Sequence, residues 1–182
     1  RRSFLQDQGI GVASVRAGNV IGGGDWADDR LIPDILRSFE KSEPVVIRNP
    51  KATRPWQHVL EPLSGYLILA QKLYEDQKEY AEGWNFGPNE KDVKPVDWIL
   101  DKMIVKWPSS SWELDKNSNP HEADFLKLDI SKAESKLGWN PVWELSQTLD
   151  KIIDWHKNWL NKEDMQAICL AEIEEYTRDM NK

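Results

Sequence analysis

Residues Arg16–Trp26 read RAGNVIGGGDW, a short apolar run that breaks into three consecutive glycines and then an acid and an aromatic residue. The run from Gly11 to Ala17 alternates small and β-branched residues, as a buried β-strand does. The glycines remove every Cβ atom, so backbone N–H groups can approach a bulky or anionic partner. The stretch therefore predicts a strand that ends in a ligand-binding loop. A merely flexible strand-to-loop transition is the alternative interpretation of the glycines.

The segments on either side of this stretch predict the fold class. Residues 1–9 predict the end of a helix, with Gly9 suited to a left-handed cap, and Leu31–Phe39 predicts a helix with Pro33 in its first turn. A helix, a glycine and a buried strand make half of a βαβ unit, so we expect an α/β fold with a parallel sheet. The start of the second helix would offer free N–H groups to an anion, and Arg30 would add a full charge.

Helix and strand patterns alternate along the rest of the chain. Strands are predicted at 45–47, 57–59, 84–86, 112–114 and 125–128, and helices at 61–77, 96–107, 131–137, 145–160 and 164–180. Ser131 is predicted to cap the 131–137 helix, and Gly138 to end it. The last helix has one apolar face, which could dock on the body of the chain or on a partner.

Composition limits the classes of function. The chain has 182 residues, 40% of them hydrophobic, which allows one core or one core and a small satellite. A net charge of −7 argues against a nucleic-acid surface, because such surfaces need clustered Lys and Arg. Cys169 is the sole cysteine and no apolar run approaches the length of a membrane span, so we expect a cytoplasmic protein without disulfides or membrane contact. The chain also begins without Met, which suggests a fragment.

Two stretches carry the candidate binding residues. Asn19 stands at the end of the first predicted strand, where open α/β sheets bind ligands and where an amide can donate to a diphosphate oxygen. Arg54 opens the sequence RPWQH, which places a guanidinium beside Trp56 and His58. A surface ion pair is the alternative for Arg54, and a hydrogen-bonded strand histidine is the alternative for His58. Most of the 10 tryptophans predict packing, whereas Trp26 and Trp56 are candidates for ligand contact.

Other chemistries have weak support in the sequence. The histidines at 58, 121 and 156 and the single cysteine are too scattered to predict a metal site. No nucleophile-elbow pattern supports a catalytic triad. Tyr74 and Lys78 match Tyr-x-x-x-Lys, but they lie at a highly charged helix end after the ligand loops, and a chance match is common at this composition.

Together these motifs resemble the C-terminal part of the extended short-chain dehydrogenases/reductases that act on nucleotide sugars, and among them the CDP-glucose 4,6-dehydratase group. The resemblance covers nearly the whole chain. The glycine block and the RPWQH block are specific to that group, and the other segments recur more loosely. The segments that carry it are Val15–Trp26, Ile47–Pro50, Arg54–Pro62, Trp84–Pro88 and Pro120–Ala123.

The resemblance implies a fold, a reaction and a set of site residues. Residues 1–30 would end a Rossmann-type dinucleotide-binding domain, and residues 31–182 would form mainly a small α/β substrate-binding domain. NAD would oxidise CDP-glucose at C4, water would leave across C5 and C6, and the hydride would return at C6, as in deoxysugar biosynthesis for lipopolysaccharide O-antigen. Ala17 and Gly18 would lie near the nicotinamide. The substrate would contact Asn19, Arg30, Leu31, Ile47, Arg48, Arg54, His58, Asn89 and His121, and Pro55 after Arg54 favours CDP.

The same resemblance places the glycine fingerprint for NAD, the true Tyr-x-x-x-Lys and the acid/base residues upstream of Arg1. We therefore expect no catalytic residue within the chain and no turnover by the chain alone. The family forms homo-oligomers, and most of the usual dimer contact would also lie upstream. Two other interpretations remain open: a stand-alone sugar-nucleotide or carbohydrate binding module, and a structural domain that uses its last helix for interaction.

Overall fold

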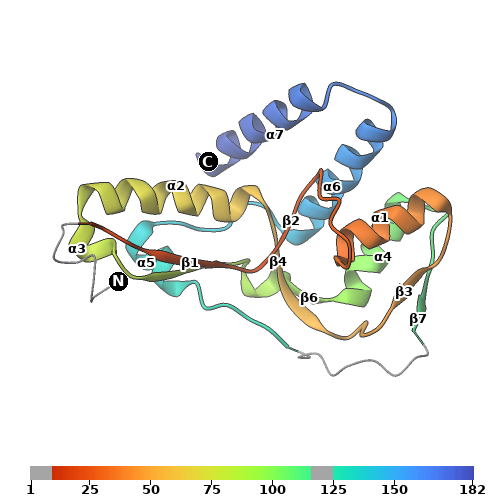
Figure 1. Ribbon diagram of the computed structural model, residues 1–182, viewed down its shortest axis with the longest axis horizontal. Coiled ribbons are helices and arrows are strands. Elements are labelled where there is room, and N and C mark those ends of the chain that lie inside the picture. The colour runs from red at the N-terminus through yellow and green to blue at the C-terminus, as the bar shows by residue number, and fades with distance from the viewer. Residues whose placement is uncertain (1–9, 116–124) are drawn as a thin grey trace.

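The computed structural model describes residues 10–115 and 125–182 (Figure 1). The helix predicted within residues 1–9 and the candidate residue His121 lie outside these ranges. Within the described ranges, the chain folds into an α/β arrangement in which most strand pairs are parallel, as the sequence predicts.

The strands form three small sheets rather than one continuous sheet. In the first, β1 (Ser14–Ala17) pairs in parallel with β5 (Gly83–Phe86). In the second, the central strand β4 (Thr53–His58) pairs in parallel with β2 (Asn19–Ile21) and antiparallel with β6 (Val93–Pro95). In the third, β3 (Val45–Ile47) pairs in parallel with β7 (Trp112–Leu114).

The predicted buried strand at Gly11–Ala17 is wrong in one respect, because β1 is mostly exposed. Val15, for example, keeps 40% of its surface exposed. The described residues cover β1 along only one edge, through β5, and the chain then changes sheets at Gly18. The Gly18 N–H donates to the Phe86 carbonyl at 3.1 Å, so Gly18 ends the first ladder as Asn19 begins the second.

One hydrophobic core joins α1 (Leu31–Lys41), α4 (Val96–Lys106) and α6 (Leu145–Leu160) to the second and third sheets. The apolar face of α6 repeats with the helical period, which buries Leu149, Ile152 and Ile153. In Figure 1 these helices lie together on the right-hand side of the molecule.

A second core lies on the other side, among α2 (Leu60–Glu75), α5 (Ser131–Leu137) and β5, next to α3 (Gln77–Tyr80). Gly138 ends α5 with a φ of 65°, as predicted. The predicted cap is wrong: Ser131 is the first helical residue, and its N–H donates to Asp129 Oδ1 at 2.9 Å. Ile130 holds the N-cap position and makes no side-chain cap, so the Asp129 carboxylate, one residue earlier, satisfies the first free N–H of the helix instead.

The last helix, α7 (Met165–Met180), docks on the body of the chain. Asp164 caps it, through hydrogen bonds from the N–H groups of Gln166 and Ala167. Figure 1 shows α7 turning back from α6 toward α2, and the buried Tyr176 makes the contact at that end. Within the described ranges, no helix is long and apolar enough to cross a membrane.

Candidate functional site

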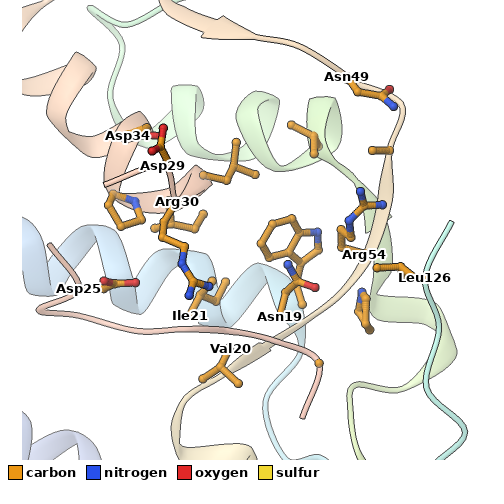
Figure 2. Close-up of a pocket in the computed structure, with 18 of the residues that line it drawn as sticks. Asn19, Val20, Ile21, Asp25, Asp29, Arg30, Asp34, Asn49, Arg54 and Leu126 are labelled. Carbon is orange, nitrogen blue, oxygen red and sulfur yellow. The ribbon is translucent and has the colours of Figure 1, made fainter. Parts of the chain in front are cut away.

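A cavity of about 880 Å³ opens where the first and second sheets meet the start of α1. Its volume is within the range of small-molecule sites in proteins. Figure 2 shows Asn19 between the side chains of Arg30 and Arg54, which come from different elements. The residues that line the cavity are Ala17–Ile21, Asp25, Asp29–Asp34, Val46–Asn49, Ala52, Arg54–Trp56, Val96 and Leu126–Leu128.

Strand pairing brings Asn19 and Arg54 to the same site. Asn19 on β2 stands opposite Trp56 on β4, and Arg54 precedes Trp56 by two residues. Residues two apart on a strand point to the same face, so Arg54 and Trp56 share the face that looks into the cavity. The Trp56 indole is buried and donates to the Lys94 carbonyl at 3.3 Å. It forms part of a rigid wall rather than an exposed stacking platform.

The opposite wall comes from the 22–30 loop and the first turn of α1. Arg30 immediately precedes α1, and no side-chain hydrogen bond caps that helix. Its positive end therefore faces the cavity without a capping carboxylate or hydroxyl. Asp29 adopts a φ of 58°, a left-handed conformation that Asp tolerates better than most residues.

Charges of both signs line the cavity: four cations, Arg30, Arg48, Arg54 and Lys127, and three carboxylates, Asp25, Asp29 and Asp34. Asp34 is paired with Arg37, which lies outside the lining. Lys127 is likewise paired with Glu90, which also lies outside the lining. Four cations against three carboxylates leave the lining with a small excess of positive charge. This balance suits a ligand that carries a compact anion and several hydroxyl groups.

The glycine triplet does not line the cavity, which corrects the interpretation that these glycines make room for a ligand. A Cβ atom on Gly23 would lie 2.3 Å from the Trp155 ring, and one on Gly22 would lie 2.8 Å from Val59 Cγ1. Gly24 has a φ of 78° and lies against the same indole. Gly23 and Gly24 thus pack on α6 and Gly22 packs on Val59, contacts that no local sequence signal reveals.

The predicted site residues divide into two groups. Eight of them line the cavity: Ala17, Gly18, Asn19, Arg30, Leu31, Ile47, Arg48 and Arg54. His58 does not, because it lies at the far end of β4 and is only 2% exposed. Its Nε2 atom is 2.9 Å from Glu172 Oε1, and its ring packs against Trp143. Asn89 also lies outside the lining, next to η2 (Glu90–Asp92), where its carbonyl accepts from the Asp92 N–H.

The other aromatic candidates are placed as follows. Trp56 lines the cavity and Trp26 does not, because Trp26 packs on α6 with its ring 4.4 Å from that of Trp159. Tyr74 is 89% exposed at the end of α2, and none of the described tyrosines lines the cavity. The described ranges also contain no cluster of His, Cys, Asp or Glu that could hold a metal ion.

Sequence reasoning missed the wall formed by Leu126, Lys127 and Leu128. This segment was predicted as an edge strand, but only Phe125 forms an isolated bridge, to Thr53. The Leu126 N–H donates to the Thr53 carbonyl at 3.1 Å, which brings the segment alongside β4. The placement depends on a long-range contact, so the local pattern could not reveal it.

Comparison with known proteins shows which of them the chain is related to. The chain is 58% identical to CDP-glucose 4,6-dehydratase of Salmonella typhimurium over 182 residues, which cover 97% of this chain and 51% of that protein. The chain is homologous to one part of a CDP-glucose 4,6-dehydratase. The chain spans about half the length of this dehydratase. It is also 26% identical to UDP-glucuronic acid decarboxylase 1 of Arabidopsis thaliana, over 88% of this chain and 36% of that protein. No family model matches the chain.

Comparison with solved structures confirms the α/β fold. UDP-glucuronic acid 4-epimerase from Bacillus cereus, in complex with UDP-glucuronic acid and NAD, matches with a TM-score of 0.68 and 22% identity, over 87% of this chain and 49% of that chain. dTDP-glucose 4,6-dehydratase from Bacillus anthracis, in complex with NAD, matches with a TM-score of 0.67 and 15% identity, over 86% and 47%. The chain therefore has the α/β fold of one part of these sugar epimerases and dehydratases.

Proposed function

We propose that the chain forms the substrate-binding part of a CDP-glucose 4,6-dehydratase and holds CDP-glucose in the described cavity. The observation that carries this proposal is the convergence of Asn19, Arg30 and Arg54 on one cavity, from three separate elements. The 58% identity to the Salmonella dehydratase supports the choice of CDP-glucose as substrate. In the cell we expect a cytoplasmic enzyme of deoxysugar biosynthesis, and a homo-oligomer when the remaining part of the dehydratase is present.

The diphosphate accounts for the charged residues of the cavity. The Arg54 guanidinium offers a planar fork of donors that matches two phosphate oxygens, and the Asn19 amide can donate to a third. Arg30 lies across the cavity from Arg54, next to the free end of α1. The end of β3, with Ile47 and Arg48, would face the cytidine. We restrict the proposed contacts to residues that line the cavity, which leaves His58 with a role in supporting β4.

Residues 1–30 would belong to the dinucleotide-binding domain and residues 31–182 mainly to the substrate-binding domain. In this division Ala17 and Gly18 would border the nicotinamide. They fit it as one wall, because both line the cavity and neither carries a bulky side chain. Gly18 itself is required by protein packing, since a Cβ atom there would lie 2.2 Å from the Pro55 carbonyl oxygen. When bound, NAD would accept the hydride from C4 of the glucose and return it to C6.

The chain's own contribution is binding and orientation. No tyrosine in the described ranges lines the cavity, and the Asp25 and Asp29 carboxylates lie on the Arg30 side, in an exposed loop. We therefore infer that proton transfer at the sugar belongs to residues outside the described ranges, and the family resemblance leads us to expect that the chain itself holds none of them. Purified chain supplied with CDP-glucose and NAD should release no CDP-4-keto-6-deoxyglucose, and measurable turnover would contradict this inference.

Isothermal titration calorimetry of the 182-residue chain tests the binding proposal. CDP and CDP-glucose should both bind, and free glucose should give no signal. Binding of glucose without CDP would favour the carbohydrate-module interpretation instead. The buried position of Trp56 argues against that outcome, because lectin-like sites present exposed aromatic faces to the sugar. Failure of CDP-glucose to bind to folded chain would overturn the proposal.

A further inference from the structure

We propose that Trp155, which does not line the cavity, is a positioning residue for the nucleotide sugar, because it fixes the 22–30 loop that forms one cavity wall. The proposal rests on the function proposed above and extends it to a residue on α6 to which neither the sequence motifs nor the comparisons assign a role. We call Trp26, Trp155 and Trp159 the aromatic anchor.

The contact between the loop and Trp155 is close and specific. A Cβ atom on Gly23 would lie 2.3 Å from Trp155 Cγ and Cδ2, so the Gly23 backbone lies directly on the indole face. A Cβ atom on Gly24 would reach the far edge of the same ring at 3.3 Å. The backbone of two successive glycines thus lies along the indole, and at Gly23 a side chain would clash with the ring.

The second contact lies on the other side of Asp25. Trp26 extends back to α6, where its ring centroid is 4.4 Å from that of Trp159 and 6.3 Å from that of Trp155. Asp25, which does line the cavity, is therefore bracketed by two contacts with one helix. The Asp25 Oδ1 atom accepts from the Ala27 N–H at 3.0 Å and closes a turn at this point.

The third contact comes from α1. Arg37 donates to the carbonyl oxygens of Trp26, at 3.3 Å, and Ala27, at 3.2 Å. The loop is otherwise exposed from Gly23 to Arg30 and contains no regular secondary structure. Its position thus depends on side chains from α1 and α6 rather than on its own backbone ladder.

The consequence concerns affinity. A loop that leaves its cavity position part of the time lowers the apparent affinity by the fraction of molecules that remain competent. Arg30 ends this loop and faces the cavity opposite Arg54. Loss of the anchor should therefore weaken binding through Arg30 and leave contacts from the β4 wall in place.

A double-mutant cycle on the full chain tests this coupling. Trp155→Ala should weaken CDP-glucose binding by roughly tenfold, as expected if about one molecule in ten keeps the loop in place. In an Arg30→Ala background the same substitution should have little further effect. Trp155→Phe should restore most of the affinity, because it keeps an aromatic face under Gly23. Trp98→Ala, which removes another partly buried tryptophan on α4, should leave affinity unchanged. Equal losses in both backgrounds, or unchanged affinity in folded Trp155→Ala, would overturn the proposal.

A ligand-free measurement separates this proposal from the proposed function. Trypsin can cut after Arg30, so the rate of cleavage at Arg30–Leu31 in native chain reports how often the loop opens. This rate should rise in Trp155→Ala and not in Trp98→Ala, relative to cleavage after Lys41 at the other end of α1. If CDP-glucose fails to bind while cleavage in Trp155→Ala rises as expected, the result contradicts the proposed function but not the role of Trp155 in holding the loop. An unchanged rate of cleavage in Trp155→Ala contradicts the role of the anchor whatever the ligand.

Discussion

Tyr176 donates a hydrogen bond to Glu61 Oε2 at 2.8 Å and so joins the last helix to the helix that follows β4. Glu61 is fully buried, and its carboxylate also accepts the N–H groups of Val142, at 3.0 Å, and Trp143, at 2.7 Å. The buried carboxylate thus holds together α2, residues 142–143 and α7. One of these segments is α2, which begins two residues after β4 ends.

The first prediction concerns this junction. Glu61→Gln should lower the free energy of unfolding by about 1–3 kcal/mol, because an amide cannot accept at both terminal atoms and leaves a buried donor unpaired. Urea denaturation followed by circular dichroism measures the change. Glu75→Gln removes a carboxylate from the exposed end of the same helix and should shift stability by less than about 0.5 kcal/mol. Equal effects of the two substitutions would show that the junction adds no particular stability.

The second prediction follows from the pKa of Glu61. Burial raises this pKa above its ordinary value, against the opposing effect of the hydrogen bonds from Trp143, Val142 and Tyr176 and of the nearby His58. An acid with a raised pKa binds protons more tightly in the folded state. Its contribution to stability is therefore largest below the unfolded pKa and falls as pH rises through the folded pKa.

The measurement compares the free energy of unfolding of wild type with that of Glu61→Gln between pH 4 and pH 7. The stability advantage of the wild type should shrink as pH rises from about 4.3, the ordinary pKa of a glutamate. An advantage that grows with pH would mean that the hydrogen bonds outweigh burial and that the folded pKa is lowered.

The third prediction concerns Gly18, where the chain passes from the first sheet to the second. Gly18→Ala should destabilise the fold by about 1–3 kcal/mol, because its Cβ atom would lie 2.2 Å from the backbone oxygen of Pro55. Gly83→Ala is the matched control, since its Cβ atom would meet only Ser14 Oγ, at 3.5 Å. Thermal unfolding of both variants decides the point. A Gly18→Ala protein as stable as the control would show that β4 moves aside easily.

Local sequence patterns predicted those elements whose burial follows a single period. The helix at 145–160 matches α6 because its apolar residues repeat at the helical spacing and face one core. The strand predicted at 57–59 is wrong in its start, because β4 begins at Thr53. Pro55 lowers the strand signal there, yet on one side it pairs with Val93 of β6, and on the other it stands one residue before the β2 ladder begins at Trp56.

The candidate site shows the same limit. The convergence of Asn19 and Arg54 on one cavity could be expected from their motifs, although Asn19 begins β2 rather than ending the first strand as predicted. The reason for the glycine triplet could not, because Trp155 meets Gly23 only once α6 has packed beside the loop. His58 was predicted as a site residue because it is close to Arg54 in the sequence. Residues four positions apart on a strand are about 13 Å from each other, so His58 lies away from the cavity.

The fourth prediction tests the charge recognition at the cavity. Arg54→Ala should weaken CDP-glucose binding by about 1.5–3 kcal/mol, the range for a hydrogen bond to a charged group, which corresponds to roughly 10- to 150-fold in Kd. Arg54→Lys should recover only part of this loss, because an ammonium keeps the charge but not the planar fork that spans two phosphate oxygens. Calorimetry with CDP-glucose and with CDP measures both effects.

Salt and a control substitution complete this test of Arg54. Added NaCl should weaken binding by the wild type more than binding by Arg54→Ala, because screening acts on the charge that the variant has lost. Arg178→Ala removes an exposed arginine on α7, far along the chain from the cavity lining, and should leave affinity unchanged. If Arg54→Lys binds as tightly as the wild type, Arg54 acts as a point charge. If Arg54→Ala also binds normally, the guanidinium does not contact the diphosphate, and Arg30 with Asn19 must hold it.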